Sequence, residues 1–292
     1  MIKLYSEEII DAHMHLWDLS HGDYPWLMQK EHAFKKQLGS LEKIRKNFLI
    51  DDYQALIKPH HVTKCVHLEA NGLVKQALQE TKWLQKIADS HGFPHAIVPF
   101  ADLRDPDIEN VIKDHCQFPN VRGIRQVLFD SDLPSDPHWH RGFAALAKQN
   151  LTFDLCFFGH QLSQIAKVVK EHDDILFVLD HLGWPEDLSD GGFSKWKEEM
   201  SLLSSYPNTH LKLSGIGLIF KTLDQENISR FLRAGVEIFG EDRCFFGSNV
   251  PPDTLFLTYN QLMESMKEAL SVYDLKVQRK LFYQNAKDFY DI

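Results

Sequence analysis

The chain has 292 residues, of which 43% are hydrophobic and 25% charged, and its formal net charge is −9. This length is close to that of one (β/α)8 barrel, and no Gly/Ser/Pro-rich linker divides it, so we predict a single domain over residues 1–292. The negative charge is spread without long runs of one sign, which argues against a partner that is nucleic acid or an anionic membrane. No apolar run is long enough to span a bilayer.

The N-terminal residues and the cysteines favour a cytoplasmic protein. Acidic residues appear at once, at Glu7 and Glu8, unlike the layout of a signal peptide. The cysteines are far apart and form no C-x-x-C pair, so we expect them to be reduced and mostly buried. They are Cys65, Cys116, Cys156 and Cys244.

The first predicted strand, residues 9–15, ends in an H-x-H pair. Strand alternation places Asp11, His13 and His15 on the same side. Two imidazoles at one strand end are suited to hold a divalent metal ion or a polarised oxygen. The simpler alternative is that both histidines only end the strand and find ordinary hydrogen-bond partners.

A long connection is predicted after this strand, over residues 16–50. Connections of this length are uncommon in compact domains and are often binding loops. Trp17, Tyr24 and Trp26 are candidates to line a substrate pocket there. Packing of these rings beneath the loop is an equally good alternative.

Seven further apolar runs predict strands, and stripes of apolar residues at helical spacing lie between them. The runs are residues 64–69, 96–101, 121–125, 151–156, 175–181, 210–215 and 243–249. Helices are predicted at 73–91, 144–147, 165–169, 231–239 and 262–270, with another starting at Asp105-Pro106. Strands that alternate with helices predict an α/β fold with a parallel sheet, and eight of them in this length favour a (β/α)8 TIM barrel.

Polar residues end most of these strands. The active site of a TIM barrel lies at the C-terminal ends of its strands, and buried charges there are costly unless they are paired or bind a ligand. Their convergence therefore predicts one polar site at the mouth of the barrel. The residues are His13, His15, Glu69, Asp102, Arg125, Asp154, His181, Lys212 and Asn249.

Several stretches resemble the amidohydrolase superfamily, in particular its amidohydrolase-related branch of lactonase-like hydrolases. The resemblance implies a (β/α)8 barrel that hydrolyses lactones of sugar acids or of aromatic-degradation intermediates. It covers essentially the whole chain, because the matching stretches follow in the expected order. They are residues 10–18, 121–125, 178–183, 212–215, 239–243, 246–248 and 285–286.

The resemblance also implies roles for single residues. His13, His15 and His181 are the implied ligands of one divalent metal ion, with zinc as the first candidate, and metal-independent catalysis is the open alternative. Arg125 is implied to bind an anionic or carbonyl oxygen of the substrate. Two further polar positions of the branch are matched by Lys212 and Glu69.

Asn249 departs from the family pattern, in which strand eight ends with the Asp that takes a proton from the attacking water. An amide has no proton affinity near neutral pH, so Asn249 cannot be the general base. The candidate replacements are Asp253, Asp154, His181 and Asp180. Asp253 follows two prolines and also fits the N-cap of a helix.

We therefore predict an enzyme that hydrolyses a small ester-like bond, foremost a lactone. Two alternatives stay open. One is a barrel that binds a small acidic ligand without catalysis, which Asn249 suggests, and the other is a metal-dependent decarboxylase. The predicted partner is a small-molecule substrate, and a homodimer is left open.

Overall fold

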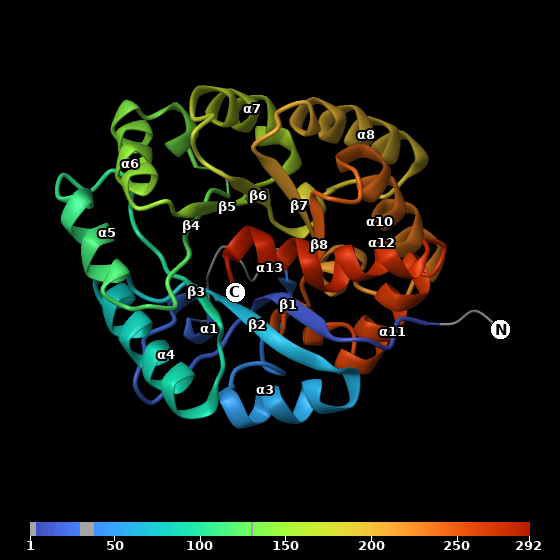
Figure 1. Cartoon of the computed structure of the whole chain (residues 1–292), viewed down its shortest axis with the longest axis horizontal. Coiled ribbons are helices and arrows are strands. Elements are labelled where there is room, and N and C mark those ends of the chain that lie inside the picture. The colour runs from blue at the N-terminus through green and yellow to red at the C-terminus, as the bar shows by residue number, and fades with distance from the viewer. Residues whose placement is uncertain (1–3, 30–37, 130) are drawn as a thin grey trace.

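The computed structural model describes residues 4–29, 38–129 and 131–292, and parallel strands form its centre (Figure 1). Neighbouring strands pair in the orders β1-β2-β3 and β4-β5-β6-β7-β8. The strands are β1 (Ile9–Met14), β2 (Val62–Leu68), β3 (Ala96–Val98), β4 (Gly123–Val127), β5 (Thr152–Cys156), β6 (Phe177–Leu179), β7 (Thr209–Leu213) and β8 (Cys244–Phe246).

Backbone contacts close the two sheets into a barrel. Phe100 pairs with Arg125 between β3 and β4, and Met14 pairs with Val250 beyond β8. The N–H of His15 donates to the carbonyl of Val250 at 2.8 Å. The predicted (β/α)8 TIM barrel is confirmed.

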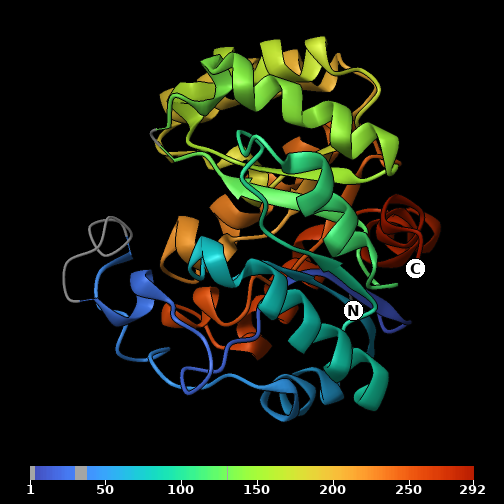
Figure 2. The same ribbon diagram turned by 90° about the vertical axis from the view of Figure 1, so that its left-hand side faces the viewer.

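Helices surround the barrel, as the side view in Figure 2 also shows. Three of the described helices begin after an aspartate that accepts a backbone N–H of the first turn: Asp136 before α6, Asp224 before α10 and Asp274 before α12. The helices are α1 (Pro25–Met28), α3 (Ile50–Ile57), α4 (Ala77–His91), α5 (Ile108–Cys116), α6 (Pro137–Lys148), α7 (Leu162–Glu171), α8 (Asp190–Ser204), α9 (Ile216–Phe220), α10 (Gln225–Phe239), α11 (Tyr259–Leu270), α12 (Leu275–Arg279) and α13 (Asn285–Tyr290).

Some predicted boundaries are wrong for local reasons. β3 ends before Pro99, which lacks the N–H that a strand ladder needs. The helix predicted at Asp105-Pro106 begins only at Ile108, because the Asp105 carboxylate accepts the N–H of Asp107 at 2.8 Å and forms a turn.

The predicted connection 16–50 contains α1, and its ends are joined where Trp17 pairs with Phe48. Residues 30–37 of this connection lie outside the described residues. In the described ranges, no helix has both the length and the apolar character needed to cross a membrane. The cysteines are mostly buried, as expected, with Cys116 half-buried.

One end of the barrel is filled by the C-terminal helix. α13, red in Figure 1, crosses the barrel, and its Phe289 and Tyr290 pack with Ile10, Val66 and Phe245 from the strands. In the part of the chain that the structure describes, the opposite end, where the strands finish, is the end left for a ligand.

Candidate active site

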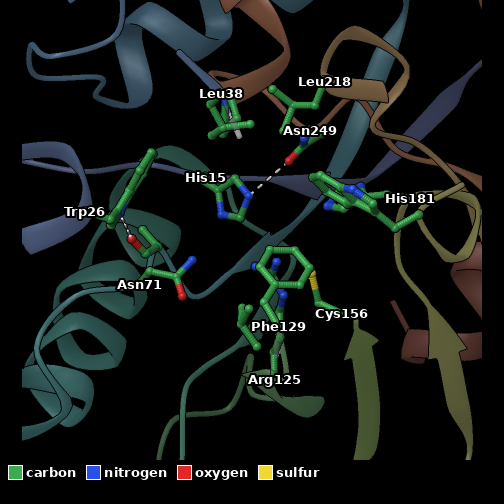
Figure 3. Close-up of a pocket in the computed structure, with 14 residues that line it drawn as sticks. His15, Trp26, Leu38, Asn71, Arg125, Phe129, Cys156, His181, Leu218 and Asn249 are labelled. Atoms are coloured by element: carbon green, nitrogen blue, oxygen red, sulfur yellow. Dashed lines mark hydrogen bonds between the residues drawn. The ribbon is translucent and has the colours of Figure 1, made fainter. Parts of the chain in front are cut away.

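A cavity opens at the C-terminal ends of the strands. In Figure 3, four predicted site residues from different parts of the chain, His15, Arg125, His181 and Asn249, meet around it. Its described lining residues are His15, Trp26, Leu38, Ala70, Asn71, Arg125, Val127, Phe129, Cys156, His181, Trp184, Leu218, Asn249 and Pro252.

His15 and Asn249 form a pair of atoms with lone pairs on the cavity wall. Nδ1 of His15 lies 2.9 Å from the carbonyl oxygen of Leu68, which only accepts, so the ring proton is on Nδ1. Burial, followed by the charge of Arg125, lowers the pKa of His15 well below its usual value, so the ring is neutral and Nε2 bears a lone pair. This Nε2 lies 3.3 Å from Oδ1 of Asn249.

Asp253 sets the orientation of the Asn249 amide. Nδ2 of Asn249 donates to Oδ1 of Asp253 at 2.7 Å, which turns Oδ1 of Asn249 toward His15. Asp253 is fully buried, and its other oxygen accepts the N–H of Gly217 at 2.8 Å. Burial raises the pKa of Asp253 to about 7, although these hydrogen bonds by themselves lower it. Once ionised, this carboxylate only accepts, and the amide has one orientation.

His181 lies on the other side of the cavity and is held by Ser214. Its Nδ1 lies 2.9 Å from Oγ of Ser214, and its backbone N–H donates to the same oxygen at 3.2 Å. Its backbone is left-handed (φ 53), and a Cβ on Gly215 would come within 2.7 Å of it. Such strain in a residue other than glycine is typical of functional sites. Burial lowers the pKa of His181 to about 3, so the ring is neutral.

Asp180 is the buried carboxylate at the centre of the charged groups beneath the cavity. Its Oδ2 lies 3.0 Å from Nε of Arg125, and its Oδ1 lies 3.2 Å from both Nζ of Lys212 and Nδ1 of His13. Burial alone would raise the pKa of Asp180, but the charges of Lys212, His13 and Arg125 hold it well below its usual range. Asp180 therefore orients Arg125 and His13 from below.

The charge of Arg125 is balanced within the protein. Besides its contact with Asp180, its Nη1 lies 3.6 Å from Oε1 of Glu69 and donates to the Glu69 carbonyl at 3.3 Å. Among the described lining residues, Arg125 is the single Lys or Arg. This wall therefore offers no unbalanced positive charge to an acidic ligand.

The residues around His13 fit one divalent metal ion. His13, Asp180 and His181 each offer one ligand atom, and these atoms lie within 4.8 Å of one another. Nε2 of His13 is buried and has no hydrogen-bond partner among the described residues. Two imidazoles and a carboxylate are a ligand set that zinc uses. In this group of candidate ligands, Asp180 is found instead of the predicted His15. The metal-binding role of His15 stays a prediction.

Besides His13 and Trp17, four further predicted site residues are not among the described residues that line this cavity. Asp154 and Lys212 pair with each other inside the barrel, and both side chains are fully buried. Glu69 lies behind Arg125 and lines a neighbouring cavity, and Asp253 lies behind Asn249. The direct catalytic or substrate contacts of these four residues stay predictions: Asp154, Lys212, Glu69 and Asp253.

Of the aromatic residues in the long connection, some line a cavity and others pack beneath the loop, which are the two predicted alternatives. Trp26 lines the cavity, and its Nε1 donates to the carbonyl of Ala70 at 2.8 Å. Trp17 does not line it but packs edge-on against Trp26, with 5.7 Å between the ring centroids. Tyr24 lines the neighbouring cavity.

Two residues that hold this site stand out only in the structure. From the sequence, Asp180 is one of several candidate bases and Ser214 only part of a motif. Both follow directly after a buried strand, β6 and β7, and this position is the signal that points to them. Asp102, at another predicted strand end, instead pairs with Arg104 at 2.8 Å near the surface.

Residues 10–292 match the family model described as amidohydrolase. The chain belongs to this amidohydrolase family. The resemblance seen in the sequence motifs is thus confirmed, and this amidohydrolase is an enzyme of the superfamily. It is 35% identical to the uncharacterized protein y4mH of Sinorhizobium fredii, over 97% of this chain and 98% of that protein.

Two further comparisons extend the likeness. The amidohydrolase is 28% identical to an L-fucono-1,5-lactonase of Burkholderia ambifaria, over 84% of this chain and 81% of the other. A crystal structure of an amidohydrolase from Burkholderia multivorans with bound zinc has the same fold. Its TM-score is 0.85 at 23% identity, with 98% of this chain and 99% of that chain covered.

Proposed function

We propose that this amidohydrolase hydrolyses a neutral lactone of a sugar acid. The observation that carries the proposal is the pair of lone-pair-bearing atoms, Nε2 of His15 and Oδ1 of Asn249, 3.3 Å apart on the cavity wall. Two acceptors that face each other need a donor, and one water molecule can donate to both. A water held in this way is oriented for attack on a bound carbonyl.

His15 is the base of the proposed reaction. As the water oxygen attacks the lactone carbonyl carbon, one proton moves to Nε2 of His15 while the other stays hydrogen-bonded to Asn249. The ring C–O bond then breaks, and His15 returns the proton to the leaving alkoxide, so lactone and water give the hydroxy acid. Asn249 positions the water where other family members have a carboxylate, which removes the need for proton affinity at this residue.

Arg125 and His181 are suited to donate hydrogen bonds to the carbonyl oxygen as negative charge develops on it. The Ser214 hydroxyl can donate to Nδ1 of His181, which leaves the Nε2–H of His181 for the oxyanion. In the other tautomer, Nε2 of His181 bears a lone pair and could instead hold a divalent metal ion. A divalent cation held by His13, Asp180 and His181 would supply Lewis-acid polarisation of the carbonyl.

The walls and charges of the cavity favour a neutral ring as substrate. Leu38, Phe129, Trp184 and Leu218 offer apolar surface for the C–H groups of a sugar ring. A carboxylate on the substrate would face Arg125, whose charge Asp180 and Glu69 already balance, and burying an unpaired charge is costly. The lactonase relatives support the same substrate class.

A substrate panel tests the proposal. It contains neutral aldonic 1,4- and 1,5-lactones, a dicarboxylic lactone, simple esters and hydroxybenzoic acids, each assayed with a chelator and with added zinc. We expect ring opening of neutral lactones, with little turnover of the dicarboxylic lactone. Absence of hydrolysis for every lactone and ester under both conditions would exclude a lactonase. Release of carbon dioxide from an aromatic acid would favour the decarboxylase alternative.

A reciprocal exchange tests the role of Asn249. Asn249→Asp should lower kcat/KM by roughly tenfold or more, since it loses a hydrogen bond and places a carboxylate against Asp253, a cost of about 1–3 kcal/mol. Adding Asp253→Asn restores a donor–acceptor pair and should recover much of the loss. Steady-state kinetics on the best lactone measure both variants. A gain of hydrolysis in Asn249→Asp alone would instead indicate that the natural protein is a binder.

A further inference from the structure

A second group of candidate metal ligands lies outside the barrel, where α6 and α7 meet (Figure 1). His140 belongs to α6, Glu171 is the last residue of α7, and His172 follows it. Each offers one ligand atom, and these atoms lie within 4.8 Å of one another. This outer group shares no residue with the candidate active site.

The ring of His140 is oriented as in many metal-binding histidines. Its Nε2 lies 2.9 Å from the carbonyl oxygen of Pro134, which only accepts, so the proton is on Nε2 and Nδ1 bears a lone pair. A ligating histidine usually donates its other N–H to such a carbonyl. Nδ1 faces Nε2 of His172 at 2.8 Å and lies 3.4 Å from Oε2 of Glu171.

His172 completes the group as a second imidazole. Its ring packs on Phe143, with 4.4 Å between the ring centroids. Without a metal, the Nε2–H of His172 donates to Nδ1 of His140. A tetrahedral zinc ion with Zn–N bonds of about 2.0–2.1 Å needs the two nitrogens about 3.3 Å apart. The rings would therefore move only slightly, with the His172 proton transferred to its Nδ1 through solvent.

Glu171 makes the outer group accessible and adds negative charge. Its side chain is 61% exposed, whereas that of His140 is 20% exposed, so an ion can reach the two imidazoles from solvent past the carboxylate. Imidazole ligands favour zinc and similar transition metals over magnesium or calcium.

We propose that His140, Glu171 and His172 bind one zinc ion, with water as the fourth ligand. The ion would connect α6 to the end of α7 and stabilise the folded protein. Its role is structural, because none of its ligands lines the cavity. This proposal does not depend on the proposed lactone hydrolysis.

Zinc binding to the metal-free full-length protein tests this proposal, by calorimetric titration and by metal analysis after gel filtration. The test variant is His140→Gln/His172→Gln, and the matched control is His138→Gln, an exposed histidine of the same helix. Each of these proteins is also prepared with the additional substitution His13→Gln. This weakens zinc binding in the cavity, so that the measured zinc content reports the outer group. We expect the test variant to bind one zinc ion fewer than the control, and zinc to raise the unfolding temperature of the control only.

A single substitution at the exposed Glu171 covers the case in which the double variant does not fold. Glu171→Gln keeps the shape of the side chain but removes its charge, and it should weaken zinc binding on the order of tenfold or more. Equal zinc content in the double variant and the control would overturn the proposal. So would an unchanged zinc affinity in Glu171→Gln.

Discussion

Replacing Lys212 with methionine should lower the free energy of unfolding by about 3–5 kcal/mol, the usual cost of removing one partner from a buried ion pair. Lys212, Asp154 and Asp180 all have fully buried side chains, and Nζ contacts Asp154 and lies 3.2 Å from Oδ1 of Asp180. Methionine keeps the apolar stem but removes the charge. Among the described residues, Asp154 would then retain as donor the hydroxyl of Tyr290, at 2.9 Å.

Urea unfolding of matched variants measures this cost. Lys148→Met is the control, because Lys148 pairs with Glu109 at 2.7 Å on the surface, where the two side chains are 58% and 55% exposed. An exposed pair contributes about 0–1 kcal/mol, so the control should unfold close to the natural protein. Lys212→Met/Asp154→Asn should regain part of the loss by removing the unpaired charge. A cost for Lys212→Met no larger than that of the control would refute this account of the barrel interior.

His15→Gln should lower kcat for lactone hydrolysis by about 10²–10⁴-fold, the range that general-base catalysis contributes. Glutamine is close to histidine in length, and its amide falls near the position of Nε2, so the polar character of the site is kept. It has no nitrogen that takes a proton from water. KM should change much less than kcat, because in the proposed reaction His15 contacts the water rather than the sugar ring.

Steady-state kinetics at several pH values check this prediction. His91→Gln is the control, an exposed histidine at the end of α4 that lines neither cavity. Circular dichroism and urea unfolding of both variants show whether the fold is kept. If the His15→Gln enzyme keeps the natural kcat, another residue is the general base, and His181 would be the next residue to substitute.

The sequence by itself was sufficient for the barrel and for placing four polar residues at its mouth. Apolar runs ending in His15, Arg125, His181 and Asn249 alternate with helices, and strands of a parallel barrel all point their C-terminal ends to the same side. Residues hundreds of positions apart could therefore be predicted to meet without knowledge of any distance. The order of the motifs likewise identified the family, which the family model then confirmed.

Only the tertiary structure decided how far each side chain lies below the mouth of the barrel and which atoms of the site carry protons. Strand alternation tells on which side of the sheet a residue lies but not how far below the mouth, so Asp154, the third residue of β5, was predicted at the site yet pairs with Lys212 in the interior. The proton on His15 depends on the Leu68 carbonyl, and the Asn249 amide depends on Asp253. Such partners come from separate elements, and only packing brings their atoms within hydrogen-bonding distance.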